Sequence, residues 1–415
     1  MISVDAALEL IRQHSRALPA ETVPLAQAEG RVLAEAVHAA RALPPFHNSA
    51  MDGYALHWRP DIEAGRVLPV LGEQAAGDGE RTLGEGAFAI MTGALMPKGA
   101  DTVVPVEDVT VLARDAQGRP LAIRLDATPV HGQHVRLSGQ DVALGSAVLA
   151  AGIRLSPEAL MILRGVGIAR VVVHRRPRVA LACTGRELVD EDGAALLPGQ
   201  IANTNGPYLA WLLQRCGAEL VAQVTVPDDA DALEAQVHGW EAMGIEVVVT
   251  TGAVSMGRYD FVPDVLKRVG AEVVFHKLAM RPGKPLLFAR LRSGALFFGL
   301  PGNPVSSAVG ARFFVSAALR RLCGQGDETP WPLPLAAATS KKAGFRMIQK
   351  AELQLGERGQ LQVLPSRGQE SFRIAPMLRA QAWLHLPEAA EVIAAGSLVA
   401  VYPADPQLDT LFYGA

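Results

Sequence analysis

The sequence has few cysteines, no long apolar run and no excess of basic residues, and each absence excludes a class of protein. Its three cysteines, Cys183, Cys216 and Cys323, are odd in number and far apart. They form neither a disulfide framework nor a zinc pattern, and they suit a reducing cytoplasm. No apolar run reaches about 18 residues without charge, so no membrane span is expected. The formal net charge of -3 gives no basic excess for nucleic acid or an anionic membrane surface.

Several common catalytic motifs are also absent. There is no Walker A sequence and no G-x-G-x-x-G after a strand, which disfavours nucleotide hydrolysis and dinucleotide binding. No Ser-His-Asp arrangement is visible, and Gly252-x-x-Ser255 is not a nucleophile elbow. The pair His131 and His134 is too isolated to predict zinc. Cys183 ends a buried strand, which favours packing over a role as nucleophile.

The 415 residues, 49% of them hydrophobic, predict a folded chain of three or four domains. Residues 1–26 and 147–176 are predicted to be two parts of one elongated helical unit, and Ser156-Pro157 is a good helix start. Residues 27–146 contain short β-type runs separated by glycine and proline. This rhythm predicts a small β-rich domain inserted into the first unit.

The second half of the chain changes pattern. In residues 177–326, apolar runs of strand length alternate with helical stretches. Near-continuous apolar strands separated by helices predict a doubly wound α/β domain, with a parallel sheet covered on both faces. Residues 327–415 return to short strand-like runs and proline breaks, typical of a further β domain.

Three strands of the predicted α/β domain end in glycine-bearing turns. These turns contain Thr184-Gly185, Gly252 to Ser255, and Pro301-Gly302-Asn303-Pro304. Ligands of open α/β sheets bind beyond the carboxyl ends of the strands, and glycine lets backbone N–H groups approach an anion. Each turn alone could simply connect a strand to a helix. The three together, with serines beside them, favour a pocket for a phosphorylated ligand.

Acids form a second set of signals in loops, and three of the five, Glu187, Asp228 and Asp260, lie at or just beyond the ligand edge of the sheet. A cationic stretch follows them along the chain. Carboxylates at the sheet edge suit Mg²⁺, which prefers hard oxygen ligands and bridges phosphates. Fixed cations among prolines and glycine suit an incoming oxyanion. The acids could instead be solvated or cap helices, and the cations could be ordinary surface charge. The predicted acids are Asp52, Asp141, Glu187, Asp228 and Asp260, and the cations are Lys277, Arg281 and Lys284.

Seven stretches, taken together, resemble one family: the molybdopterin molybdenumtransferases, related to the C-terminal domain of gephyrin. They run in the family's order over about residues 1–325, and their combination is highly specific. The stretches are SAMDGYA (49–55), MTGALMPKGAD (91–101), VRLSGQD (135–141), TGREL (184–188), TGAVSMGRYDF (251–261), KLAMRPGKP (277–285) and GLPGNPVS (299–306).

The resemblance implies an elongated helical domain, an inserted β-rich domain, a central pterin-binding α/β domain and a C-terminal β-barrel. It implies a cytoplasmic homodimer whose cleft combines the central domain of one subunit with the N-terminal domains of the other. The implied reaction inserts molybdate into adenylylated molybdopterin with Mg²⁺ and releases AMP. Other proteins of molybdenum cofactor synthesis are the implied partners.

The resemblance also assigns roles by position. It places Glu187, Asp228 and Asp260 among the family's functional acids, predicted to lie near magnesium. It places Lys277 and Arg281 near molybdate, with Arg281 standing where lysine is usual, and Lys284 is added from the same cationic stretch. Asp52 and Asp141 join the three magnesium acids as catalytic residues. By position the resemblance adds Thr92, Pro301, Pro304 and Ser371 to the predicted substrate-binding residues. The strand-end turns themselves supply Thr184, Gly185, Gly252, Ser255, Gly302 and Asn303.

The chain departs from the family pattern at three places. Arg186 stands where the family has aspartate, Ala253 where it has a second glycine, and residues 369–373 keep only a trace of the pattern. These departures leave open a divergent paralogue that binds or delivers the pterin, or inserts tungstate, with little molybdate turnover. A gephyrin-like scaffold is a third hypothesis, against which the absence of a partner-binding tail before residue 1 counts.

Overall fold

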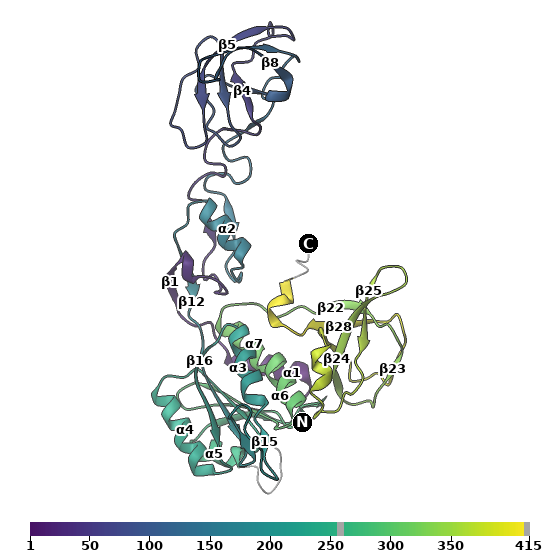
Figure 1. Cartoon of the computed structure of the whole chain (residues 1–415). Coiled ribbons are helices and arrows are strands. Elements are labelled where there is room, and N and C mark those ends of the chain that lie inside the picture. The colour runs from purple at the N-terminus through teal and green to yellow at the C-terminus, as the bar shows by residue number, and fades with distance from the viewer. Residues whose placement is uncertain (255–260, 411–415) are drawn as a thin grey trace.

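The computed structural model describes residues 1–254 and 261–410. The molecule is long, with an inserted β domain (residues 47–136) at one end and a broad base at the other (Figure 1). An arm (residues 19–46 and 137–176) joins the two. The base consists of a central α/β domain (residues 1–18 and 177–326) beside a C-terminal β domain (residues 327–410). Within the described part of the chain, no helix is long and apolar enough to cross a membrane.

The arm is built from two short antiparallel strand pairs and one helix. Its strands are β1 (Ala20–Pro24) with β12 (Arg170–His174), and β2 (Val37–His38) with β11 (Ala147–Leu149). Helix α2 (Pro157–Gly165) begins where the sequence predicts, because the Ser156 hydroxyl accepts a hydrogen bond from the Ala159 N–H at 3.2 Å. Leucine and valine side chains from both parts of the chain share its small core.

The packing differs from the predicted domain boundaries in two ways. Helix α1 (Val4–His14), predicted to belong to the arm, buries Val4, Ala7 and Ile11 in the core of the central domain. Residues 32–43, predicted to lie in the inserted domain, pair with arm residues, as Leu33 does with Val173. An amphipathic pattern shows that a helix has a buried face but does not identify the surface that covers it.

The inserted domain is a six-stranded, mostly antiparallel sheet. Its strand order is β7-β4-β6-β5-β9-β8, and only β5 and β6 pair in parallel. A short pair, β3 (Asn48–Ser49) with β10 (Val135–Arg136), lies where the domain joins the arm. The six strands are β4 (Gly53–Leu56), β5 (Val67–Gln74), β6 (Ala87–Ile90), β7 (Thr102–Pro105), β8 (Val109–Arg114) and β9 (Pro120–Leu125).

The central domain is a six-stranded sheet in the order β16-β13-β17-β21-β20-β18. The predicted all-parallel sheet is wrong for one strand, because β20 runs antiparallel to both neighbours. Only residues 291–295 connect β20 to β21, too few for the crossover that parallel strands require. The strands are β13 (Arg178–Thr184), β16 (Glu219–Val226), β17 (Val247–Thr251), β18 (Glu272–His276), β20 (Leu287–Arg290) and β21 (Leu296–Leu300).

Helices cover both faces of this sheet, as predicted. Two apolar cores result, one under α4 and α5 and the other under α1, α3 and the last helices of the domain. A small parallel pair, β14 (Leu188–Val189) with β15 (Ile201–Ala202), flanks the sheet. The helices are α3 (Asn205–Arg215), α4 (Ala230–Ala242), α5 (Val262–Arg268), α6 (Pro304–Gly310), the π-helical turn η3 (Ala311–Val315) and α7 (Ser316–Leu322).

The C-terminal domain is a sheet that closes on itself. Its order is β19-β24-β26-β28-β22 with β25 beside β24, and a bridge between Leu335 and Val363 joins the β22 end to β25. Strands β23 (Thr339–Ser340) and β27 (Val392–Ile393) pair at its rim. The other elements are β19 (Met280–Arg281), β22 (Trp331–Pro334), β24 (Arg346–Leu355), β25 (Leu361–Pro365), β26 (Ala382–Leu386), β28 (Leu398–Pro403), η4 (Ala375–Leu378) and η5 (Pro406–Thr410).

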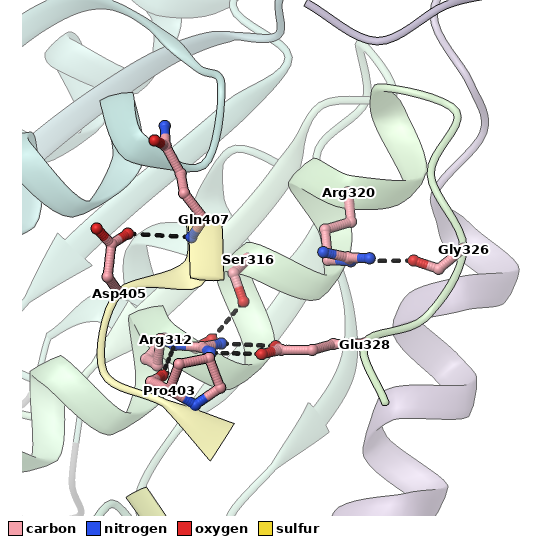
Figure 2. A network of polar contacts seen from close by, with 8 residues as sticks. All are labelled: Arg312, Ser316, Arg320, Gly326, Glu328, Pro403, Asp405 and Gln407. Carbon is pink, nitrogen blue, oxygen red and sulfur yellow. Dashed lines mark hydrogen bonds and ion pairs between the residues drawn. The ribbon is translucent and has the colours of Figure 1, made fainter. Parts of the chain in front are cut away.

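A buried ion pair fixes the C-terminal domain against the central helices (Figure 2). The Arg312 guanidinium, on the π-helical turn, donates to both carboxylate oxygens of Glu328 at 2.7 and 2.6 Å. It also donates to the Pro403 carbonyl at the end of β28. The side chain of Arg312 is 1% exposed and that of Glu328 is 10% exposed. A charge at this depth is tolerated only because its partner and the carbonyl replace water.

Candidate active site

The three glycine-bearing turns lie together at one edge of the central sheet. Strands β13, β17 and β21 are adjacent and parallel, so their carboxyl ends coincide. The Thr184 hydroxyl donates to the Thr251 carbonyl at 2.9 Å, and the Gly252 N–H donates to the Leu300 carbonyl at 3.0 Å. A methyl group added to Gly302 would lie 3.7 Å from the Gly252 Cα. The turns therefore form one continuous surface.

The middle turn requires glycine at position 252. Gly252 has φ +91°, and an added Cβ would lie 2.5 Å from the Thr184 hydroxyl oxygen and 2.8 Å from its carbonyl oxygen. Ala253, which replaces the family's second glycine, also has a positive φ of +52°. The left-handed conformation costs a residue with a side chain about 1 kcal/mol or more. This departure therefore leaves the turn in place but strained.

Two of the predicted acids flank the first turn. A Cβ on Gly185 would lie 2.8 Å from each carboxylate oxygen of Glu187, so that carboxylate folds back over the turn. The Arg186 N–H points at an Asp228 carboxylate oxygen at 3.4 Å. Asp229, not Asp228, caps α4 by accepting from the backbone N–H groups at its start. Asp228 is exposed, and no helix cap explains its position.

The third turn leads into helix α6 and contacts the C-terminal domain. Asn303 is the N-cap residue and Pro304 the first helical residue. The Val305 N–H donates to the Ser371 carbonyl at 3.0 Å, so the predicted Ser371 does reach this turn, through its backbone. The Ser307 hydroxyl donates to the carbonyl of Pro301 and has a structural role.

The predicted cations lie between β18 and β20, in a segment that starts at the same edge of the sheet. Arg281 is on the short strand β19, and Lys277 and Lys284 lie on either side of that strand in sequence. The His276 Nε2 is 2.8 Å from the Val254 carbonyl, which ties this loop to the middle turn. The Arg281 guanidinium lies over the Phe345 ring, 4.8 Å from its centre, and Lys284 is exposed. Neither these two nor Lys277 pairs with a carboxylate in the part of the chain that the structure describes. Their positive charge is available to an anion.

The remaining acids lie elsewhere in the chain. In the inserted domain, an Asp52 carboxylate oxygen accepts a hydrogen bond from the Thr92 N–H at 2.7 Å. This bond holds the pKa of Asp52 below its usual value. Asp141 lies in the arm, and its side chain forms no hydrogen bond or ion pair with Asp52 or Thr92 in the structure described. The inserted domain lies far from the central sheet in Figure 1, so one chain does not assemble both groups.

Two predicted residues cannot be placed, and two unpredicted ones belong to the site. Ser255 and Asp260 lie outside the described residues. Asn205 donates from its side-chain amide to the Gly302 carbonyl at 2.8 Å, and His276 contacts the middle turn as above. Asn205 begins a helix and His276 ends a strand at the ligand edge. Ligands of open α/β sheets bind beyond the carboxyl ends of the strands. Both positions could have been found by considering every strand end and helix start on that edge, and not only the three glycine-bearing turns.

An apolar groove adjoins the third turn. It has a volume of about 660 Å³ and lies between α3 and η4 of the C-terminal domain. Asn205 and Pro304 form its end at the turn, and Tyr208, Trp211 and Trp383 contribute aromatic walls. The polar edge of the sheet thus continues into a surface suited to a flat ring.

Three family models match consecutive parts of the chain. Residues 2–167 match the MoeA N-terminal region (domains I and II), residues 180–321 a probable molybdopterin binding domain, and residues 332–404 the MoeA C-terminal region (domain IV). A molybdopterin molybdenumtransferase of Synechococcus elongatus is 38% identical, over 97% of this chain and 99% of the relative. One from Haemophilus influenzae is 34% identical, over 97% and 98%.

The chain belongs to the molybdopterin molybdenumtransferase family. The resemblance seen in the sequence motifs is thereby confirmed. A solved structure of a molybdopterin biosynthesis MoeA protein from Pyrococcus horikoshii matches with a TM-score of 0.78 at 26% identity, covering 97% of this chain and 100% of that one. A second structure from the same organism gives a TM-score of 0.75 at 29% identity, covering 97% and 99%. The predicted multidomain architecture is confirmed at this level.

Proposed function

We propose that the protein inserts molybdate into adenylylated molybdopterin, with release of AMP, in the cytoplasm. The observation that carries the proposal is the convergence of Gly185, Gly252 and Gly302 at one sheet edge, in the domain that matches the molybdopterin-binding model. Family membership supports the reaction type. The three free, buried cysteines suit the cytoplasm.

Each group at the edge has a chemical task in this reaction. Backbone N–H groups of the turns bind the phosphate oxygens of the adenylate. The apolar groove beside Pro304 receives a flat ring of the substrate, and Asn205 fixes the turn at its mouth. Lys277, Arg281 and Lys284 attract molybdate and hold it as an anion near the pterin sulfurs. Thr184 acts indirectly, by holding the first two turns together.

The donor set at the first turn fits Mg²⁺. Glu187 and Asp228 supply hard carboxylate oxygens, and Mg²⁺ commonly uses one or two carboxylates with waters and phosphate oxygens. No group of three or more metal-binding side chains occurs among the residues described, so the remaining ligands would come from water and substrate. When bound, the ion would neutralise phosphate charge as the adenylate leaves.

The complete cleft is proposed to form in a homodimer. Asp52 and Thr92 belong to the inserted domain, which the arm separates from the central sheet (Figure 1), so their use requires the inserted domain of a second copy. Mixing an Asp52→Asn chain with a Glu187→Gln chain tests this directly. A shared cleft restores one wild-type cleft per mixed dimer, about a quarter of full activity after random exchange. No recovery, with mixed dimers demonstrated by mass, would contradict the shared cleft.

The central experiment is an AMP-release assay. Purified protein is given adenylylated molybdopterin and Mg²⁺ with molybdate, and separately with tungstate. AMP and active cofactor should form with molybdate, and Glu187→Gln or Asp228→Asn should slow release by about 100-fold or more. Glu191→Gln, an exposed acid on the loop after β14, is the matched control. Absence of AMP release by the wild-type protein sinks the catalytic proposal.

A second candidate function is favoured by Arg186. Its backbone N–H contacts Asp228, and its exposed side chain adds a positive charge to the turn that holds Glu187. A positive charge on this turn disfavours a metal ion there. A protein that binds or delivers the pterin without turnover would bind the adenylate tightly and leave it intact. Arg186→Asp would then create AMP release that the wild-type protein lacks, whereas an active wild-type enzyme rules this candidate out.

A further inference from the structure

A second basic cavity lies away from the candidate active site, where the arm meets the base. It has a volume of about 360 Å³. Its walls come from the arm (Glu29, Gly30 and the segment 154–157), from Arg176, from the end of α3 (Gln214, Arg215, Gly217) and from Gln407 of the C-terminal domain. Three domains therefore share one small cavity, and none of the residues assigned above to the reaction lines it.

Two of the three arginines in this cavity have no acidic partner. Arg215 pairs with Asp405, which lies beside Gln407 (Figure 2). Arg154 donates only to neutral oxygens, including the Gln325 side chain at 2.9 Å. Arg176 donates only to the Glu29 carbonyl at 3.4 Å. Neither forms an ion pair with any residue that the structure describes.

The Arg176 charge is only partly compensated. Burial, and after it the guanidinium groups of Arg31 and Arg154, lower the pKa of Arg176, and the weaker effect of Glu219 opposes them. The Glu29 carboxylate also lines the cavity, but Glu29 is exposed and forms no ion pair with these arginines. The start of α2, at Ser156 and Pro157, adds the positive end of a helix dipole to the same wall. The unpaired guanidinium groups and the helix start favour a bound anion, and Glu29 is the one acid among the described residues of the lining that opposes it.

We propose that this cavity binds a phosphate dianion, either inorganic phosphate or the phosphate of a monoester, and that the anion ties the arm to the base. Two unpaired guanidinium groups match two negative charges, and guanidinium–phosphate contacts are strong and geometrically specific. Gln214 and Gln407 also line the cavity, and each carries a neutral side-chain amide with two N–H groups. The Gln407 amide donates one of them to the Arg215 carbonyl at 3.0 Å. The bound anion would contact all three domains at once.

Binding of inorganic phosphate to the full-length protein, without pterin or molybdate, tests this inference. Isothermal titration at constant ionic strength should detect one site per chain in the wild-type protein. Arg176→Gln should weaken binding by about 10-fold or more, because a charge-assisted contact is lost. Arg176 makes a single long hydrogen bond, so this variant should fold. Arg164→Gln, an exposed arginine at the other end of α2, is the matched control and should bind as the wild type does.

Three further results decide the inference. Equal binding by the Arg176 and Arg164 variants, or none by the wild type, overturns it. Loss of phosphate binding in Lys284→Gln but not in Arg176→Gln would place the anion at the candidate active site, and also overturns it. Competition between AMP and phosphate would support a monoester ligand, whereas binding of phosphate alone would support the inorganic ion.

Discussion

The central sheet and the inserted sheet each have six strands, but they assemble polar residues by different rules. In the central sheet, adjacent parallel strands end at one edge, so the turns after β13, β17 and β21 meet whatever their spacing in sequence. In the inserted sheet, Asp52 meets Thr92 because β4 and β6 pair antiparallel, with Gly53 opposite Ile90. The meeting of the three turns therefore depends on strand order, whereas the contact between Asp52 and Thr92 depends on the register of β4 against β6.

The two sheets also differ in burial. Every residue of β17 and β21 is buried, because helices cover both faces. Strand β5 alternates between exposed and less exposed positions along most of its length. The same kind of substitution should therefore lower the free energy of unfolding more in the base than in the inserted domain. Matched variants, one in each domain, test that difference.

The largest difference is expected for ion pairs. Arg312→Met leaves the Glu328 carboxylate buried without a cation, which should lower the free energy of unfolding by about 3–5 kcal/mol. Arg119→Met removes the exposed pair with Asp115 in the inserted domain and should cost about 1 kcal/mol or less. Urea unfolding followed by tryptophan fluorescence measures both. Equal losses would refute the comparison.

A smaller difference is expected for two glycines with positive φ. Gly252→Ala adds both backbone strain and a clash with Thr184, so it should cost roughly 2–4 kcal/mol. Gly118, in the inserted domain, has φ +80° and no atom within 4 Å of an added Cβ. Gly118→Ala should therefore cost only strain, about 1 kcal/mol. If both variants lost the same stability in urea, contact with Thr184 would not constrain the turn.

The smallest effect is expected at Ala253. Ala253→Gly removes the backbone strain of the left-handed conformation, but it also raises the conformational entropy of the unfolded chain. The free energy of unfolding should therefore rise by only about 0.5 kcal/mol. Ala180→Gly in the buried strand β13 is the control and should lose stability, since it gains no relief. If Ala253→Gly lowered the free energy of unfolding as much as Ala180→Gly does, Ala253 would be unstrained.

The convergence of the three turns could be predicted from the sequence because its rule is local. Glycine after an apolar run marks a strand end, and parallel order brings such ends together, so Gly185, Gly252 and Gly302 could be named together. The antiparallel direction of β20 could not be predicted from its composition, because its residues are as apolar as those of the neighbouring strands. The short connection after it was the available signal.

Long-range packing could not be predicted in the same way. Helix α1 has a clear apolar face, but only the folded chain shows that the central core, and not the arm, covers it. The side chain of Arg312 looks like surface charge in sequence, since its partner Glu328 and the Pro403 carbonyl are brought to it by the fold. The placement of Asp52 far from the turns likewise depends on the arm.

The hydrogen bond from the Val305 amide to the Ser371 carbonyl has a consequence for how the two domains of the base move. It occupies one of the first N–H groups of helix α6, a group with no partner inside the helix. Separation of the C-terminal domain would expose this amide to solvent at the edge of the turn. The rate at which Val305 exchanges its proton for deuterium therefore reports, from a single atom, how often the domains part.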